Sequence, residues 1–184
     1  MYYDNDISIR PVEKRDLLRL WELVYKEDKP EWKKWDAPYF PHNSISYEQF
    51  MKETAASWIG KEGFWVIVVD DIVRGIVSYY FEDDQQKWLE IGIVLHESGS
   101  WNKGIGTRAL KLWLPHVFKT IPVQRVGLTT WSGNERMMRV GEKIGMQLEG
   151  RMRKVRFYNE TYYDSIRMGI LREEFETSPL YVHS

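Results

Sequence analysis

The sequence predicts one domain of the α+β class: a mixed, mostly antiparallel twisted sheet of about seven strands with about four helices packed on it. The chain has 184 residues, a usual length for one domain, and 43% hydrophobic and 15% aromatic residues can fill its core. Three apolar runs between residues 64 and 95 are joined by short polar turns, which indicates an antiparallel meander. Neither a repeat nor a linker divides the chain, so we expect residues 1–184 to form a single unit.

The first half of the chain predicts one short strand, two helices and the meander. Apolar residues alternate over 7–10, recur at helical spacing over 17–24, and do so again over 47–59 after Ser46, a favoured helix N-cap. Between these helices, residues 31–41 hold two prolines and four aromatic residues, which indicates an irregular loop. The strands of the meander are expected over 64–69, 73–81 and 88–95.

The second half predicts a glycine-rich turn, two helices and three further strands. A helix is expected over 108–118 with a kink at Pro115, and another over 135–144 that Gly145 ends. The strands are expected over 124–130, 147–158 and 161–171, the last two joined as a hairpin.

The turn Trp101–Thr107 is the most informative segment of the second half. Because it leads a strand into a helix, its backbone N–H groups and the positive end of the helix dipole point at one place. Such a cluster of donors suits a phosphate or a pyrophosphate. Glycine at positions 104 and 106 would let the backbone approach that ligand closely.

Two nucleotide-binding motifs resemble this turn only in part. A P-loop requires a lysine and a serine or threonine after its last glycine, where this chain has Ile105 and Gly106. Residues 104–109 do match the dinucleotide pattern G-x-G-x-x-A, but no carboxylate ends the strand predicted after the helix, and an antiparallel meander precedes the turn. A dinucleotide site therefore stays the less favoured reading.

The order of these features resembles the GNAT superfamily of acyl-CoA-dependent N-acetyltransferases. The turn fits the family pattern [QR]-x-x-G-x-[GA], except that Trp101 stands at the Gln or Arg position. Further matches are the strand 90–95, the segment Trp131-Ser132-Gly133-Asn134, and Glu142-Lys143-Ile144-Gly145-Met146 followed by Leu148-Glu149-Gly150. The resemblance covers Ile7–Leu171 and looks closest to the branch with ribosomal-protein-alanine and diamine acetyltransferases.

The resemblance implies acetyl-CoA as the cosubstrate and no metal. The pyrophosphate would bind the turn, the pantetheine would bind the backbone of a strand that splays from its neighbour, and Arg108 or Lys103 would add charge. The expected acetyl-CoA contacts are Ile93, Leu95, Trp101, Asn102, Lys103, Gly104, Ile105, Gly106, Thr107, Arg108, Asn134 and Lys143.

Amine acetylation needs a group that takes a proton from the amine and a donor that stabilises the thioester oxygen and the leaving thiolate. Glu90 is the expected base, because partial burial in an apolar strand would raise its pKa, although a water chain is the alternative. Asn134 is expected near the thioester or as a helix N-cap. The related branch has a serine at the position of Met137, which donates no proton, so Tyr158, a water or an unassisted departure would serve the thiolate.

The aromatic loop lies where the resembled family binds its acceptor. Trp32, Trp35 and Tyr39, beside Glu31 and Asp36, are expected to hold a cationic amine by charge and cation–π contact, unless the rings only cap the core.

The expected function is N-acetylation of a primary amine (a protein N-terminus, a polyamine or another small amine) by direct attack in a ternary complex. The alternatives are a non-catalytic acyl-CoA-binding module, for which Met137 argues, and a dinucleotide-dependent oxidoreductase.

Composition narrows the partners and the compartment. The net charge of −1 predicts no nucleic acid partner, and no apolar run reaches the ~20 residues that span a membrane. The chain has no cysteine, so thiolate catalysis is excluded. The polar first residues are unlike a signal peptide, so we expect a cytoplasmic protein. The exposed final hairpin pairs subunits in many folds of the resembled family, which allows a homodimer.

Overall fold

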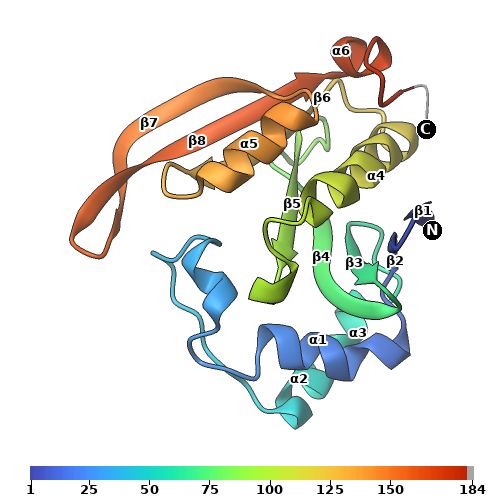
Figure 1. Cartoon of the computed structure of the whole chain (residues 1–184), viewed down its shortest axis with the longest axis vertical. Helices are drawn as coiled ribbons and strands as arrows, with labels where there is room; N and C mark the ends of the chain where they lie inside the picture. Colours follow the sequence, from blue (N-terminus) through green and yellow to red (C-terminus); the bar gives the residue numbers. More distant parts are fainter. Residues whose placement is uncertain (182–184) are drawn as a thin grey trace.

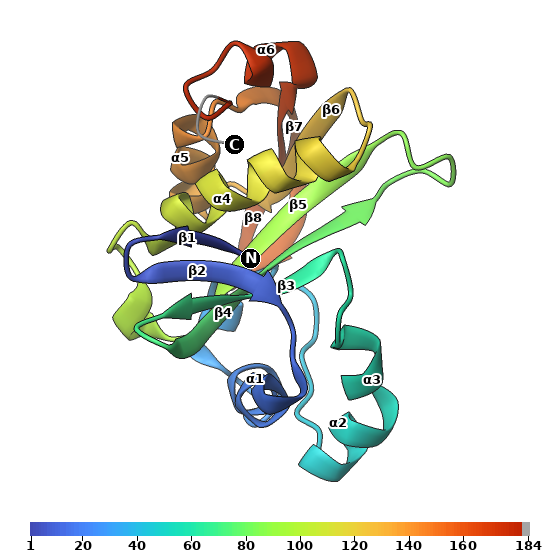
Figure 2. The ribbon, with the colours of Figure 1, turned by 90° about the vertical axis from the view of Figure 1, so that its right-hand side faces the viewer.

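In the computed structural model, which describes residues 1–181, eight strands form one twisted sheet with helices on both faces (Figures 1 and 2). The order across the sheet is β1-β2-β3-β4-β5-β6-β8-β7. The strands are β1 (Tyr2–Asp4), β2 (Ile7–Pro11), β3 (Phe64–Val69), β4 (Ile72–Phe81), β5 (Leu89–Leu95), β6 (Arg125–Trp131), β7 (Gln147–Tyr158) and β8 (Thr161–Leu171). The helices are α1 (Leu17–Val24), α2 (Tyr47–Glu53), α3 (Ala55–Trp58), α4 (Ile105–Thr120), α5 (Glu135–Lys143) and α6 (Arg172–Glu176). Single 3₁₀ turns span Lys14–Asp16, Glu31–Lys34 and Ser98–Ser100.

The predicted fold class and the antiparallel meander, β3 to β5, are confirmed. Three details differ from the prediction. The three-residue strand β1, which pairs with β2, and the short helix α6 gave no periodic signal in the sequence. The helix expected over 47–59 is divided at Thr54, whose φ of −122° departs from helical geometry. Helix α4 spans Ile105–Thr120 with Pro115 inside it, and so extends beyond the expected 108–118 at both ends.

The sheet separates two hydrophobic cores. The larger core lies under α4, α5 and α6, with Trp113 of α4 fully buried against it. The smaller core lies on the opposite face, where Leu20 of α1 and Phe50 of α2 pack with Val66 and Val68 of β3 (Figure 2). Because β3 is covered on both sides, its six residues are apolar throughout rather than alternating.

The divergence of β5 from β6 determines where a ligand can enter. These two strands are the parallel neighbours in the sheet, and they pair only at Leu89 with Val126 and Glu90 with Gly127. Beyond those pairs, β5 runs on to Leu95 and β6 to Trp131 without forming a ladder. The opening lies at the carboxyl ends of both strands, from which the chain leads into α4 and α5 (Figure 1). Such an edge is the usual position of a ligand site in sheets with parallel strands.

Candidate active site

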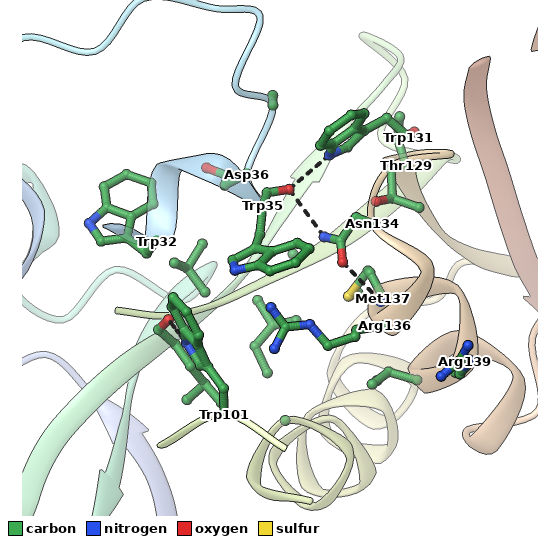
Figure 3. Close-up of a pocket in the computed structure, with 18 of the residues that line it drawn as sticks. Trp32, Trp35, Asp36, Trp101, Thr129, Trp131, Asn134, Arg136, Met137 and Arg139 are labelled. Carbon is green, nitrogen blue, oxygen red and sulfur yellow. Dashed lines mark hydrogen bonds between the residues drawn. The ribbon is translucent and has the colours of Figure 1, made fainter. Parts of the chain in front are cut away.

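A cavity of about 560 Å³ fills the opening between β5 and β6. Its walls come from β5, β6, the loop before α4, the inner side of α5 and the aromatic segment that follows α1 (Figure 3). This volume is in the range of small-molecule and cofactor sites. The glycine-rich turn and the aromatic segment both line the cavity, and they meet where the rings of Trp35 and Trp101 lie 6.3 Å apart, edge to face.

The glycine-rich turn has the backbone geometry that an anion site requires. Gly104 is the N-cap of α4 and has φ of +77°, a left-handed conformation that glycine adopts most readily. A Cβ on Gly104 would meet no protein atom within 4 Å, so its backbone angle, and not crowding by the protein, calls for glycine. Gly106, in the first turn of α4, lines the cavity without a side chain. The uncapped N–H groups of α4 therefore face an open space that suits a phosphate.

Ten of the twelve residues expected to contact acetyl-CoA line this cavity. The two exceptions are Lys103 and Arg108, which line a neighbouring polar groove instead. The guanidinium of Arg108 is held by Asp4 at 2.6 Å and Asp6 at 2.8 Å, on and beside β1. Because β1 was not expected, neither was the pairing that turns Arg108 away from the cavity.

Trp101, the unusual residue of the motif, closes the turn onto β5. Its indole Nε1 donates a hydrogen bond of 2.7 Å to the carbonyl oxygen of Leu95. This bond occupies a backbone acceptor that we expected to serve the pantetheine. The side chains of Ile93 and Leu95 face α4 and join the larger core, as the alternation of the strand predicted.

Helix α5 contributes a row of cationic side chains to the cavity. Arg136, Arg139 and Lys143 all line it, and their spacing places them on one helical face. The guanidinium carbon of Arg136 lies 3.8 Å from the ring centroid of Trp35 (Figure 3). Its Nη1 is 3.3 Å from Asn102 Oδ1. Burial lowers the pKa of Arg136. Of these three residues, only Lys143 was expected from the sequence, although the i, i+3, i+7 spacing would have revealed the other two.

Asn134 has the structural role of an N-cap and a second role in the loop. Its Oδ1 accepts from the backbone N–H of Met137 at 3.2 Å, which caps α5. Its Nδ2 donates to the carbonyl oxygen of Trp35 at 3.1 Å, and Trp131 Nε1 donates to the same oxygen at 2.9 Å (Figure 3). The aromatic segment is thereby tied to the ends of β6 and α5. Met137 lines the cavity.

Glu90, the expected base, is fully buried and does not line the cavity. Its carboxylate accepts from Thr129 Oγ1 at 2.7 Å and lies 3.1 Å from Arg167 Nη1 and 3.4 Å from Arg125 Nη1. Glu90 is thus fully buried among side chains of β6 and β8, and not partly buried as we expected. The structure therefore brings Glu90 to the site only indirectly, through Thr129, which does line the cavity.

Tyr158, the expected proton donor, also lies outside the cavity. It packs edge-on against Trp131, which lines the cavity, with ring centroids 6.1 Å apart. The long hairpin of β7 and β8 carries Tyr158 behind this indole, a placement that local sequence patterns do not encode.

The aromatic segment forms another wall of the cavity, and we call the part beside Tyr39, Phe40 and Arg156 its aromatic end. Trp32, Trp35 and Tyr39 all line it, as expected, but Trp32 also supports the fold by donating from Nε1 to the carbonyl oxygen of Leu23 at 3.0 Å. Among residues 1–181, Asp36 is the one carboxylate that lines the cavity. Its side chain stays open to solvent, but protein surrounds it on most sides, and the resulting loss of hydration raises its pKa.

Within residues 1–181, no group of three or more histidine or acidic side chains is arranged to hold a metal ion. No helix in this part of the chain is long and apolar enough to cross a membrane.

Comparisons with known proteins agree with this architecture. A family model described as the acetyltransferase (GNAT) domain matches residues 6–147. The N-acetyltransferase YokL of Bacillus subtilis, named as prophage-derived and uncharacterized, is 25% identical over 173 residues, 93% of each chain. The spermidine N(1)-acetyltransferase of Escherichia coli K12 is 24% identical over 174 residues, 93% of this chain and 89% of that protein.

A similar solved structure is RimL, a ribosomal L7/L12 alpha-N-protein acetyltransferase in complex with coenzyme A. It has a TM-score of 0.73 and 18% identity, and the alignment covers 91% of this chain and 95% of that one. The resemblance predicted from the glycine-rich turn and its neighbours is thus confirmed, and this chain belongs to the acetyltransferase (GNAT) domain family.

Proposed function

We propose that this acetyltransferase moves the acetyl group of acetyl-CoA to a primary amine by direct attack, with both substrates bound together. The observation that carries the proposal is the cavity between β5 and β6, which is lined both by the glycine-rich turn before α4 and by the aromatic segment with Asp36. A thioester in the middle of that cavity would be open to an amine from the aromatic end. The relatives named for spermidine and ribosomal protein acetylation support an amine as the acceptor.

The cosubstrate would lie along the turn and α5. The N–H groups at the start of α4 and the side chains of Arg136, Arg139 and Lys143 offer donors and positive charge for the phosphates. The unpaired edge of β5 offers backbone groups for the pantetheine amides. Backbone N–H groups on that edge would also stabilise the negative charge that develops on the thioester oxygen.

Asp36 is the group that we propose to receive the proton of the attacking amine. Unlike Glu90, it lines the cavity, and the burial that raises the pKa of Asp36 makes its carboxylate a stronger base. It would also attract the ammonium form of the acceptor before attack. The chain has no cysteine, so a thiol-bound acyl enzyme plays no part. The thiolate of CoA is a weak base and would depart without Tyr158.

The test is release of free CoA from acetyl-CoA in the presence of a panel of amines. We expect Asp36→Asn to reduce kcat by about 10²-fold or more, the usual contribution of an acid–base group. The matched control is Asp84→Asn in the exposed turn between β4 and β5, which should keep full activity. An Asp36→Asn variant with the kcat of the wild type would rule out the proposed role of Asp36. Binding of acetyl-CoA without acetyl transfer to any amine of the panel would rule out the proposed reaction.

A non-catalytic acyl-CoA-binding role is the second candidate, because Met137 lines the cavity where the resembled branch has a serine. It predicts acetyl-CoA binding in calorimetry together with no amine-dependent CoA release. Turnover with any amine would exclude it.

A further inference from the structure

The aromatic end of the cavity contains an arginine with no carboxylate partner among residues 1–181. Arg156 of β7 lines this end, and its guanidinium carbon lies 4.9 Å from the ring centroid of Tyr39 and 5.6 Å from that of Phe40. Its Nε is buried and has no hydrogen-bond partner. By contrast, Arg151 on the same strand is paired with Asp164 at 2.5 Å. Arg156 therefore lines the cavity without a carboxylate of the protein to neutralise its charge, and a ligand carboxylate can fill that role.

Asp36 also lines the cavity and provides the opposite charge; Lys33 and His42 lie near enough to lower its pKa, but within residues 1–181 it forms no direct ion pair. Burial raises the pKa of Tyr39, the charge of Arg156 and a side-chain hydrogen bond with Arg156 oppose this effect, and the charge of Asp36 adds to it. Both charges therefore lie near the Tyr39 phenol, one with an affinity for cations and one with an affinity for anions.

We propose that the acceptor is a small amine that carries a carboxylate, with its amine at Asp36 and its carboxylate at Arg156. This proposal rests on the transferase function proposed above and names the substrate class of that site. The planar fork of an arginine binds a carboxylate through two parallel hydrogen bonds. A polyamine would instead bring a second positive charge to Arg156, which costs affinity.

The dimensions of the cavity favour a small acceptor. Its volume of about 560 Å³ must also hold the thioester arm of the cosubstrate. The aromatic rings of Tyr39 and Phe40 would pack against the apolar part of such an acceptor.

The first experiment compares amines that differ only in the carboxylate, for example phenylalanine, phenylalaninamide and phenethylamine, with spermidine and a tripeptide beside them. CoA release by the wild-type protein gives kcat/KM for each. We expect the carboxylated compounds to be preferred over their amides and decarboxylated forms by roughly 10- to 100-fold, the usual effect of a hydrogen bond to a charged group. Equal or better turnover of spermidine, the amides or the tripeptide overturns the proposal.

The second experiment changes the arginine. Arg156→Gln should raise the KM of carboxylated acceptors by roughly 10- to 100-fold, with the KM of acetyl-CoA unchanged, and Arg156→Lys should restore part of the loss. Arg153→Gln, an exposed arginine of the same strand, is the control and should behave as wild type. An increase in the KM of acetyl-CoA instead would place Arg156 in the cosubstrate site and overturn the proposal.

The outcomes separate this proposal from the one on which it rests. Failure to bind acetyl-CoA in calorimetry, or failure to release CoA with any amine, removes the transferase function. Release of CoA with amines that lack a carboxylate leaves that function in place and removes only the role of Arg156. The wild-type panel gives this answer even where Arg156→Gln does not fold.

Discussion

Glu90→Gln distinguishes a buried structural carboxylate from a catalytic base. A base role predicts a folded protein of normal stability with a large loss of kcat. The structure predicts the opposite result, because Glu90 is fully buried and does not line the cavity. Its oxygens are already occupied by Thr129, Arg125 and Arg167.

The expected loss of stability follows from the contacts of the carboxylate. Removing one member of a buried ion pair typically costs roughly 3–5 kcal/mol. Here the loss should lie near the low end, at about 3 kcal/mol, because Arg125 keeps Glu149, Arg167 keeps Glu82, and glutamine preserves the volume. For a domain of this size, such a loss lowers the Tm by roughly 6–12 °C.

The measurement combines thermal or urea unfolding with kcat at a temperature where the variant is fully folded. Glu149→Gln is the matched control, since it removes a more exposed partner of Arg125 and should cost under about 1 kcal/mol. We expect Glu90→Gln to melt early and to keep kcat within a few fold. Normal melting with a kcat reduced about 10²-fold would refute this reasoning and restore Glu90 as the base.

Three further predictions concern the turn, its tryptophan and a buried histidine. Gly104→Ala should lose roughly 1–2 kcal/mol of stability and bind acetyl-CoA more weakly in calorimetry, because φ at Gly104 is +77°. The control is Gly99→Ala, where a Cβ would meet no atom within 4 Å, and it should change neither stability nor binding. Trp101→Phe should lose about 1 kcal/mol in urea unfolding, since its hydrogen bond to Leu95 disappears; no loss would mean that the bond contributes nothing. Burial lowers the pKa of His96 to about 4, so stability should be full above the unfolded pKa near 6.5 and fall as the pH drops toward 4. The loss between pH 7 and pH 5 should be about 2 kcal/mol for His96, and a His96→Gln variant with an unchanged pH dependence would contradict this.

The parts of the fold that were predictable are those with a local signal. The meander and the strand–turn–helix at Trp101–Thr107 follow from periodicity and glycine placement, which act over a few residues. The strand β1 escaped prediction because three residues show no period, and its stability comes from pairing with β2.

The parts of the site that were missed depend on contacts between distant segments. The residues around Glu90 in the sequence indicate a half-buried strand carboxylate, but its partners come from β6 and β8. No local pattern predicts that these strands bring arginines to Glu90. Arg156 lies in a run of basic residues that looks like an exposed strand, until the hairpin brings it to Tyr39. Arg136 is different, because its helical spacing with Lys143 was readable once the helix had been assigned.

One helix terminus links the aromatic segment to the glycine-rich turn. The carbonyl oxygen of Trp35 is fixed by Trp131 and Asn134, and the Trp35 ring lies under Arg136. Asn134 caps the helix that carries Arg136, and Arg136 also reaches Asn102 of the turn. We therefore expect a disturbance of the α5 N-terminus to displace Arg136 and to release Trp35 together. Because Asp36 directly follows Trp35, its position should depend on the same helix terminus.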